Sequence, residues 1–199
     1  MNKLYVFGDS FSKGLGIVDD GHQYEPYKGK ENLIWSSLLA DYLNLEEVNI
    51  SFNGISNDMI WDNIINKFDD FKSGDYVIIG LTKLPRFGVY SSEHKQVGLF
   101  NKAPVRDTNV GSFRHYSSFA KAGLQLIREN IGSVLENTEA NFSFLINRIN
   151  SLGCVGYCWD ETWWKKFDTI RNEVGIGDEH WSLKGHRQVF EVLKKELNK

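Results

Sequence analysis

Cysteine is scarce in this sequence of 199 residues, which contains only Cys154 and Cys158. Residues four apart in a strand lie roughly 13 Å from one another, which is beyond the reach of a disulfide. In a helix the two side chains would be neighbours with poor bonding geometry. We therefore predict buried free thiols, as in a reducing compartment. No nearby cysteine or histidine completes a zinc ligand set with them.

Long apolar runs are also missing. Lys3 is followed by only four apolar residues before Gly8, too few for the apolar region of a signal peptide. No run approaches the length that a bilayer-spanning helix needs. These absences predict a cytoplasmic protein without a membrane partner, and they leave open a release by lysis or within a particle.

An excess of basic charge is the third absence. The sequence has 23 Lys and Arg against 26 Asp and Glu, a formal net charge of -3, which predicts no nucleic-acid partner. Its 41% hydrophobic and 25% charged residues are typical of a globular domain with a core of its own. No repeat, low-complexity tract or linker is evident, so residues 1–199 are predicted to form one domain.

Strands and helices alternate along most of the sequence. Apolar runs predict strands at residues 3–7 and 75–81, and further short strands are predicted at 47–51 and 155–159. Helical spacing predicts helices at 32–43 (capped by Asn32), at 56–71, within 116–152 (in two pieces broken near Gly132), and at 182–197 (capped by Ser182). Residues 14–31 are predicted to form a loop, and 84–115 an irregular insertion.

The strand predicted at 75–81 is apolar on both faces, as a central parallel strand should be. Strands that alternate with helices indicate a three-layer α/β/α sandwich around a parallel sheet.

Polar motifs follow the predicted strands, at the edge where open parallel sheets hold their sites. They are Gly-Asp-Ser at 8–10, Asn-Gly-Ile-Ser-Asn-Asp at 53–58 and Gly-Leu-Thr at 80–82, with Asp-Glu-His-Trp-Ser-Leu-Lys-Gly-His at 178–186 before the last helix. A serine nucleophile needs an adjacent base, and the base needs an acceptor that fixes its tautomer. In an extended segment Asp178 and His180 point to the same side, so the two can interact.

Together these motifs resemble those of the SGNH, or GDSL-type, hydrolase superfamily, from Ser10 to His186 and in the family's order. The resemblance implies a flavodoxin-like parallel sheet and a serine esterase that uses no metal or cofactor. It implies that Ser10 is the nucleophile, His180 the general base and Asp178 the group that orients the imidazole. It also implies that the backbone N–H groups of Ser10 and Gly54 are oxyanion donors.

The third motif departs from the family's pattern. Where the family has Gly-x-Asn-Asp, with the Asn side chain completing the oxyanion hole, this sequence has Gly80-Leu81-Thr82-Lys83. Thr82 and Asn57 are the candidate replacements, and we expect weak activity on generic esters. Trp181 stands where a proline commonly follows the catalytic histidine, and it could alter access to His180.

Several residues near the motifs also have a structural interpretation. Asp9 is expected to tie down its turn through backbone N–H groups, and Ser10 by itself would be a helix cap. Asn57 suits a turn or a helix cap as well as a site. We expect His186 to pack within its helix and Trp35 to pack in the core or under a lid.

The resemblance implies a substrate with a short acyl ester, such as an O-acetyl group on a carbohydrate, and lipid esters and thioesters are open as well. Two alternatives accompany the esterase. One is a weakly active or non-catalytic glycan-binding module of the same fold, and the other is an acyltransferase that uses the same triad. The 84–115 insertion is expected to shape the acceptor side.

Overall fold

The computed structural model of the chain describes residues 1–17, 24–26, 31–52, 55–82, 131–159 and 180–198. Its strands are β1 (Lys3–Gly8), β2 (Leu15–Ile17), β3 (Tyr24–Pro26), β4 (Glu46–Asn49), β5 (Tyr76–Gly80) and β6 (Val155–Trp159). Its α-helices are α1 (Ser10–Lys13), α2 (Trp35–Leu43), α3 (Asn57–Ile65), α5 (Ile131–Ser151) and α7 (Leu183–Leu197). Two 3₁₀ turns, η1 (Glu31–Leu33) and η2 (Phe68–Asp70), complete the described elements.

Four parallel strands form the main sheet, in the order β4-β1-β5-β6. In chain order this is 2-1-3-4, the flavodoxin-like arrangement, whose order reverses between β1 and β5. β5 lies inside the sheet, and its residues Val77, Ile78 and Ile79 are fully buried. The predictions of a parallel sheet and of a central strand at 75–81 are therefore confirmed.

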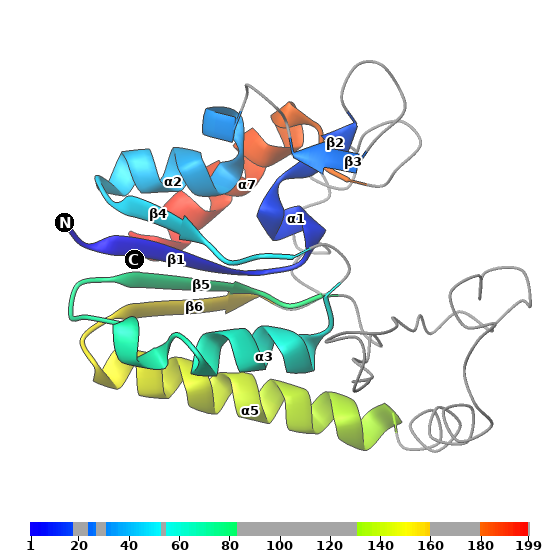
Figure 1. Cartoon of the computed structure of the whole chain (residues 1–199), viewed down its shortest axis with the longest axis vertical. Coiled ribbons are helices and arrows are strands. Elements are labelled where there is room, and N and C mark those ends of the chain that lie inside the picture. The colour runs from blue at the N-terminus through cyan, green and yellow to red at the C-terminus, as the bar shows by residue number, and fades with distance from the viewer. Residues whose placement is uncertain (18–23, 27–30, 53–54, 83–130, 160–179, 199) are drawn as a thin grey trace, which may run out of the picture.

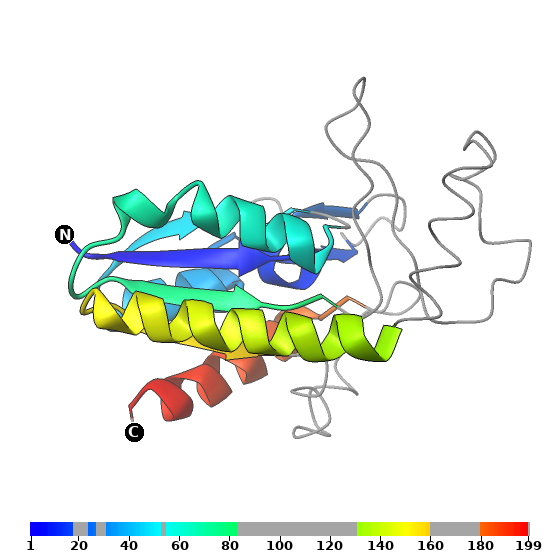
Figure 2. The ribbon, with the colours of Figure 1, turned by 90° about the horizontal axis from the view of Figure 1, so that it is seen from below.

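Helices cover both faces of this sheet (Figure 1). α2 and α7 lie on one face and α3 and α5 on the other, and Figure 2 shows the same layers from below. Because side chains alternate along a strand, Leu4 and Val6 of β1 enter the core under α2 and α7, whereas Tyr5 and Phe7 enter the other. The predicted three-layer α/β/α sandwich is confirmed.

Several element boundaries match their predictions. β6 covers the predicted residues 155–159, and α7 begins after Ser182, whose Oγ accepts a hydrogen bond from the Gly185 amide at 3.1 Å. Cys154 and Cys158 are free thiols, the first buried and the second half-buried. Trp35 is fully buried in the core, as expected.

Other local predictions are wrong. The N-cap of α2 is Ile34 in an extended conformation, not Asn32, which belongs to the 3₁₀ turn η1. Within the segment predicted as a loop, β2 and β3 pair as an antiparallel ribbon. α3 ends at Ile65, and the chain then turns through η2 so that the Phe71 ring packs on β1.

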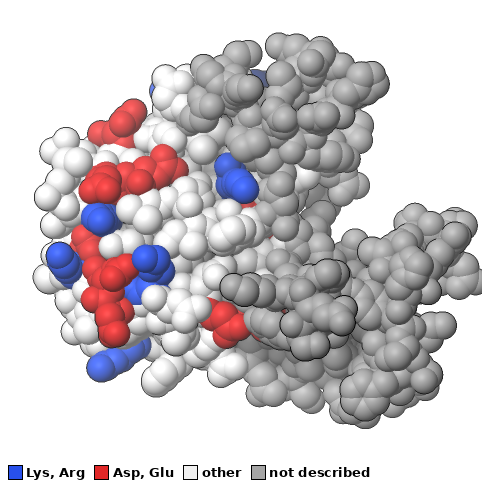
Figure 3. Space-filling view, viewed as in Figure 1, with Lys and Arg blue, Asp and Glu red and all other residues white. Residues whose placement is uncertain are grey.

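Some predictions fall outside the described residues, among them the 84–115 insertion and the first part of the 116–152 helical segment. α5 runs without a break from Ile131 through Gly132 to Ser151. The single-domain assignment stays a prediction. Among the described helices, none is both long and apolar enough to cross a bilayer. Acidic and basic side chains are intermixed on the described part of the face drawn in Figure 3.

Candidate active site

Ser10 lies directly after β1, at the C-terminal edge of the sheet where the strand order reverses. Ser10 is the first residue of α1 and is only 6% exposed. The helix cap is Asp9, whose Oδ1 accepts a hydrogen bond from the Phe11 amide at 3.0 Å. The interpretation of Ser10 as a cap is therefore wrong, and the expectation that Asp9 ties down the turn is confirmed.

The short helix α1 is held from outside by two side-chain donors. A helix of four residues leaves carbonyl groups that its own amides cannot use. The Trp35 indole donates to the carbonyl of Phe11 at 3.3 Å, and the Asn49 amide donates to that of Ser12 at 3.0 Å. α2 and the end of β4 thereby fix the position of the turn that carries Ser10.

Two glycines let α1 approach the sheet. Gly8 and Gly80 are register partners at the ends of β1 and β5, and Ser12 packs over both. A Cβ at Gly80 would lie 2.5 Å from the Ser12 Oγ and 2.6 Å from the Trp159 ring, and a Cβ at Gly8 would overlap the Ser12 side chain. The glycines of the Gly-Asp-Ser and Gly-Leu-Thr motifs are thus required because Ser12 of α1 packs directly on the ends of β1 and β5.

His180 meets Ser10 across the sheet edge. Its Nε2 lies 2.7 Å from the Ser10 Oγ, although 170 residues separate the two in sequence. The half-buried imidazole packs on the Phe11 ring, with centroids 4.9 Å apart. The structure therefore brings together the predicted nucleophile and base. Asp178 and Gly54, the predicted orienting group and oxyanion donor, lie outside the described residues, and all four roles stay predictions.

The residues around His180 are aromatic. Trp181 is buried in the core beneath α7, with its ring edge-on to both Phe11 and His186. His186 is fully buried, as its predicted packing role requires. Burial, with a smaller contribution from the charge of His180, lowers the pKa of His186 to about 3. His186 is therefore neutral at pH 7, while His180 is the imidazole that reaches Ser10.

Thr82 and Asn57 form a buried pair next to Asp9. The Thr82 amide donates to the Asn57 Oδ1 at 2.9 Å, and the Asn57 Nδ2 lies 3.4 Å from the Thr82 carbonyl oxygen. The Thr82 hydroxyl donates to the Asp9 Oδ2 at 2.9 Å. A hydroxyl has one hydrogen, so Thr82 cannot donate to an oxyanion while this bond exists. The predicted oxyanion role of the Thr82 hydroxyl would therefore require its bond to Asp9 to break, and the oxyanion roles of Thr82 and Asn57 both stay predictions.

The sequence analysis missed two contributors to this arrangement. One is Asn49, which was predicted only as part of a strand, although a polar residue at the end of a parallel strand is a signal in itself. The other is the bond between Thr82 and Asp9, which joins two motifs 73 residues apart. Among the described residues, no group of three or more His, Cys, Asp or Glu is arranged to hold a metal ion.

No model of a known protein family matches the chain, and no curated protein matches it. Similar solved structures include an aryl esterase of M. smegmatis, with 21% identity and a TM-score of 0.34 over 41% of this chain. The present chain spans 42% of that protein. A putative lipolytic protein of the G-D-S-L family from Desulfitobacterium hafniense has 13% identity and a TM-score of 0.45, covering 98% of this chain and 99% of its own.

A third similar structure is a carbohydrate esterase whose active site displays divergent catalytic and non-catalytic binding functions. Its identity to this chain is 10% and its TM-score is 0.44, with coverage of 100% of this chain and 68% of its own. Similarities of this size concern the fold and carry no activity over to the present chain.

Proposed function

We propose that the protein is a serine hydrolase that cleaves short acyl esters through an acyl-enzyme intermediate. The observation that carries the proposal is the 2.7 Å contact between the Ser10 Oγ and the His180 Nε2. This is the distance at which a base takes a proton from a hydroxyl nucleophile. A serine that served only to cap α1 would not need this contact, and Asp9 already caps that helix.

In the first half of the reaction the Ser10 Oγ adds to the ester carbonyl carbon, and its proton passes to the His180 Nε2. The N–H groups of Ser10 and Gly54 stabilise the negative charge on the former carbonyl oxygen. The bond to the leaving oxygen then breaks, and that oxygen takes the proton from His180. Asp178 holds the imidazole in the tautomer that this exchange needs.

In the second half a water molecule adds to the acyl carbon and gives its proton to His180. The bond to the Ser10 Oγ breaks, the serine recovers that proton, and the carboxylic acid leaves. O-acetyl groups on carbohydrates are the substrates we favour. An acyltransferase would run the same second half with an alcohol in place of water.

The proposal is tested with 4-nitrophenyl acetate and a serine-directed fluorophosphonate probe. Wild type should turn over the ester and take the label, whereas Ser10→Ala should do neither and remain folded. Ser12→Ala is the matched control, because it removes a hydroxyl from the same helix without touching the contact with His180. Labelling that survives in Ser10→Ala would place the nucleophile elsewhere. A folded wild-type protein without turnover or label would select the non-catalytic binding module instead.

A panel of acylated glycans, lipid esters and thioesters would then identify the substrate class. Release of free acid separates the hydrolase from the acyltransferase, which would transfer the acyl group to an added alcohol.

A further inference from the structure

The Thr82 hydroxyl has a different partner from the one that the sequence pattern suggested. Thr82 follows β5, is 1% exposed and donates to the Asp9 Oδ2 at 2.9 Å. Asp9 follows β1 and uses its other oxygen, Oδ1, to cap the Phe11 amide. One carboxylate therefore connects the end of β5 to the first turn of the helix that carries Ser10.

We propose that Thr82 is a positioning residue that acts on Ser10 through Asp9. Its hydroxyl holds the Asp9 carboxylate in the orientation in which Oδ1 caps α1. This proposal rests on the proposed function, because a position for Ser10 matters to a rate only if Ser10 is the nucleophile.

The Asn57 side chain holds the backbone of Thr82 in place. It accepts from the Thr82 amide and faces the Thr82 carbonyl, and both residues are buried. The backbone of Thr82 is therefore held in place by Asn57, and this fixes the position from which the Thr82 hydroxyl donates to Asp9. A side chain that was free to swing could not set the orientation of a carboxylate.

The charge of Asp9 makes this hydrogen bond stronger than a neutral one. Hydrogen bonds to ionised groups are roughly twice as strong as hydrogen bonds between neutral groups. Asp9 is only 5% exposed, so water cannot readily replace a lost donor. Removal of the hydroxyl should loosen the carboxylate, and with it the cap on Phe11.

The test compares Thr82→Val, which keeps the shape and removes the hydroxyl, with Thr82→Ser, which keeps the hydroxyl. We expect kcat on one ester to fall about tenfold in Thr82→Val, with KM little changed, since loss of a bond to a charged group is of this order. Thr82→Ser should recover most of the rate. Hydrogen exchange of the Phe11 amide should be about tenfold faster in Thr82→Val and close to wild type in Thr82→Ser.

A double-mutant cycle with Asp9→Ala decides whether Thr82 acts through Asp9. If it does, Thr82→Val has no further effect on kcat once Asp9 is alanine. Asp75→Asn is the control for a purely structural change, because Asp75 accepts hydrogen bonds from the Lys3 and Lys72 amides at the opposite end of the sheet. This variant should lower stability and leave kcat unchanged.

Two results would overturn the proposal. The first is a Thr82→Val protein with wild-type kcat and wild-type exchange at Phe11. The second is a Thr82→Val loss of kcat that persists in the Asp9→Ala background with unchanged exchange at Phe11, which would make Thr82 a direct oxyanion donor. If wild type has no esterase activity, the proposed function fails, and the exchange measurements still decide whether Thr82 controls the cap.

Discussion

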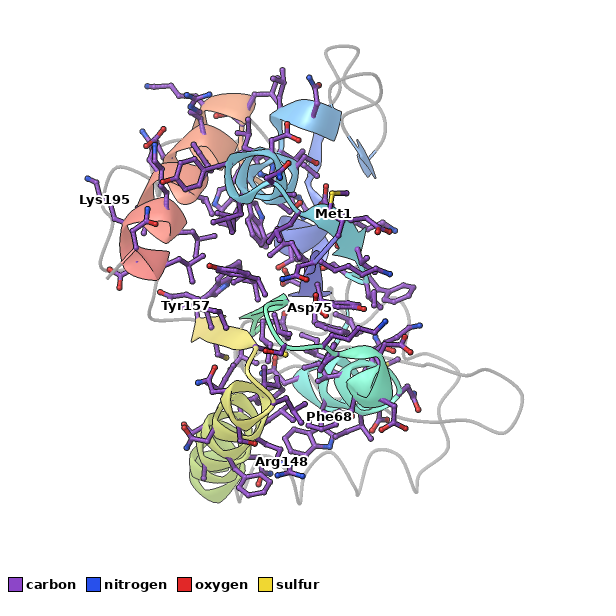
Figure 4. All side chains as sticks on the ribbon, turned by 90° about the vertical axis from the view of Figure 1, so that its left-hand side faces the viewer. Met1, Phe68, Asp75, Arg148, Tyr157 and Lys195 are labelled. Atoms are coloured by element: carbon purple, nitrogen blue, oxygen red, sulfur yellow. The ribbon has the colours of Figure 1, made fainter. Side chains whose placement is uncertain are left out.

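The two ends of the sheet each contain a buried aspartate that joins β1 to β5. At the N-terminal ends of the strands, Asp75 is 2% exposed and accepts hydrogen bonds from the amides of Lys3 and Lys72 at 2.8 and 2.9 Å. Figure 4 faces this end and shows Asp75 between the two helical layers. At the opposite end, Asp9 accepts from the Phe11 amide and from the Thr82 hydroxyl.

The two aspartates differ in the groups that donate hydrogen bonds to them. The two donors to Asp75 are backbone amides, which any residue except proline supplies, so only the aspartate itself has to be specified by the sequence. Asp9 accepts from a side chain as well as from an amide, so at least one position besides the aspartate has to be specified. The first arrangement needs only to hold strands together, whereas the second also sets the place of Ser10.

The environment of Asp75 agrees with a structural role. Burial raises the pKa of the Cys154 thiol and of the Tyr5 phenol, and the charge of Asp75 raises both further. Neither group is therefore prepared for proton transfer at neutral pH. At the other end, His180 lies in hydrogen-bond contact with a serine hydroxyl.

The largest effect is expected from His180→Ala, at the end that contains Ser10. Loss of a triad member should lower kcat by about 10⁴-fold or more, because Ser10 then has no base. The half-buried imidazole packs on Phe11 at the edge of the sheet, and we expect the fold to persist. Steady-state kinetics and urea unfolding measure the two effects. A His180→Ala protein that keeps wild-type kcat would remove the functional difference between the two ends.

Asp75→Asn should have the opposite profile. An asparagine keeps one acceptor oxygen but turns an NH₂ group toward a backbone N–H, so the free energy of unfolding should fall by about 2 kcal/mol. kcat should not change. Asp70→Asn is the control, because Asp70 is an exposed partner of Lys67 and its loss should leave unfolding nearly unchanged. A large loss of kcat in Asp75→Asn would mean that the hydrogen bonds of Asp75 also affect the geometry of the active site.

The structural end of the sheet was easier to predict from the sequence than the site. Apolar runs placed β1 and β5, because burial on both faces leaves a continuous signal, whereas the edge strands β4 and β6 are partly exposed and leave a weaker one. The cap of α2 was missed, since Asn32 has the right chemistry but stands in the turn before the helix. The β2–β3 ribbon was missed because strands of three residues leave no periodic pattern.

At the candidate active site the sequence predicted that Ser10 and His180 would lie close together, but it did not predict the hydrogen-bond partner of Thr82. The order of the motifs was enough to bring Ser10 and His180 together. The choice between Asp9 and an oxyanion as the partner of Thr82 depends on ångström-scale distances between two strand ends. No spacing along the chain encodes that choice.

Acid should destabilise the end of the sheet that contains His186. Its pKa is about 3 in the folded protein and about 6.5 when unfolded, so between these values the unfolded chain binds more protons. The contribution of the buried, neutral His186 to the free energy of unfolding is complete above pH 6.5. It is lost as the pH falls below that value, at about 1.4 kcal/mol per pH unit. His186→Leu should show a flatter decline of stability as the pH falls, because leucine does not titrate. Equal slopes in urea unfolding of both proteins between pH 7 and 5 would contradict the buried neutral histidine.

The smallest effect concerns two lysines at opposite ends of β1. Lys13 lies three residues after Ser10 on α1, hence on the same face of that helix, and its Nζ is 5.9 Å from the centre of the Phe52 ring. Phe52 is 48% exposed, and its amide bonds to Gly8 just before the Ser10 turn. Lys3, which begins β1, lies at the end of the sheet that contains Asp75.

An ammonium beside the site should favour an ester that carries a negative charge. Lys13→Gln should therefore raise KM for a succinyl ester about threefold, since two unit charges about 4 Å apart in bulk water interact by roughly 1 kcal/mol, and should leave KM for the acetyl ester unchanged. The difference should vanish in 1 M salt, where the screening length falls to about 3 Å. Lys3→Gln, the matched control, should change neither value. An equal change for both esters in Lys13→Gln would show that Lys13 acts on the shape of α1 rather than through its charge.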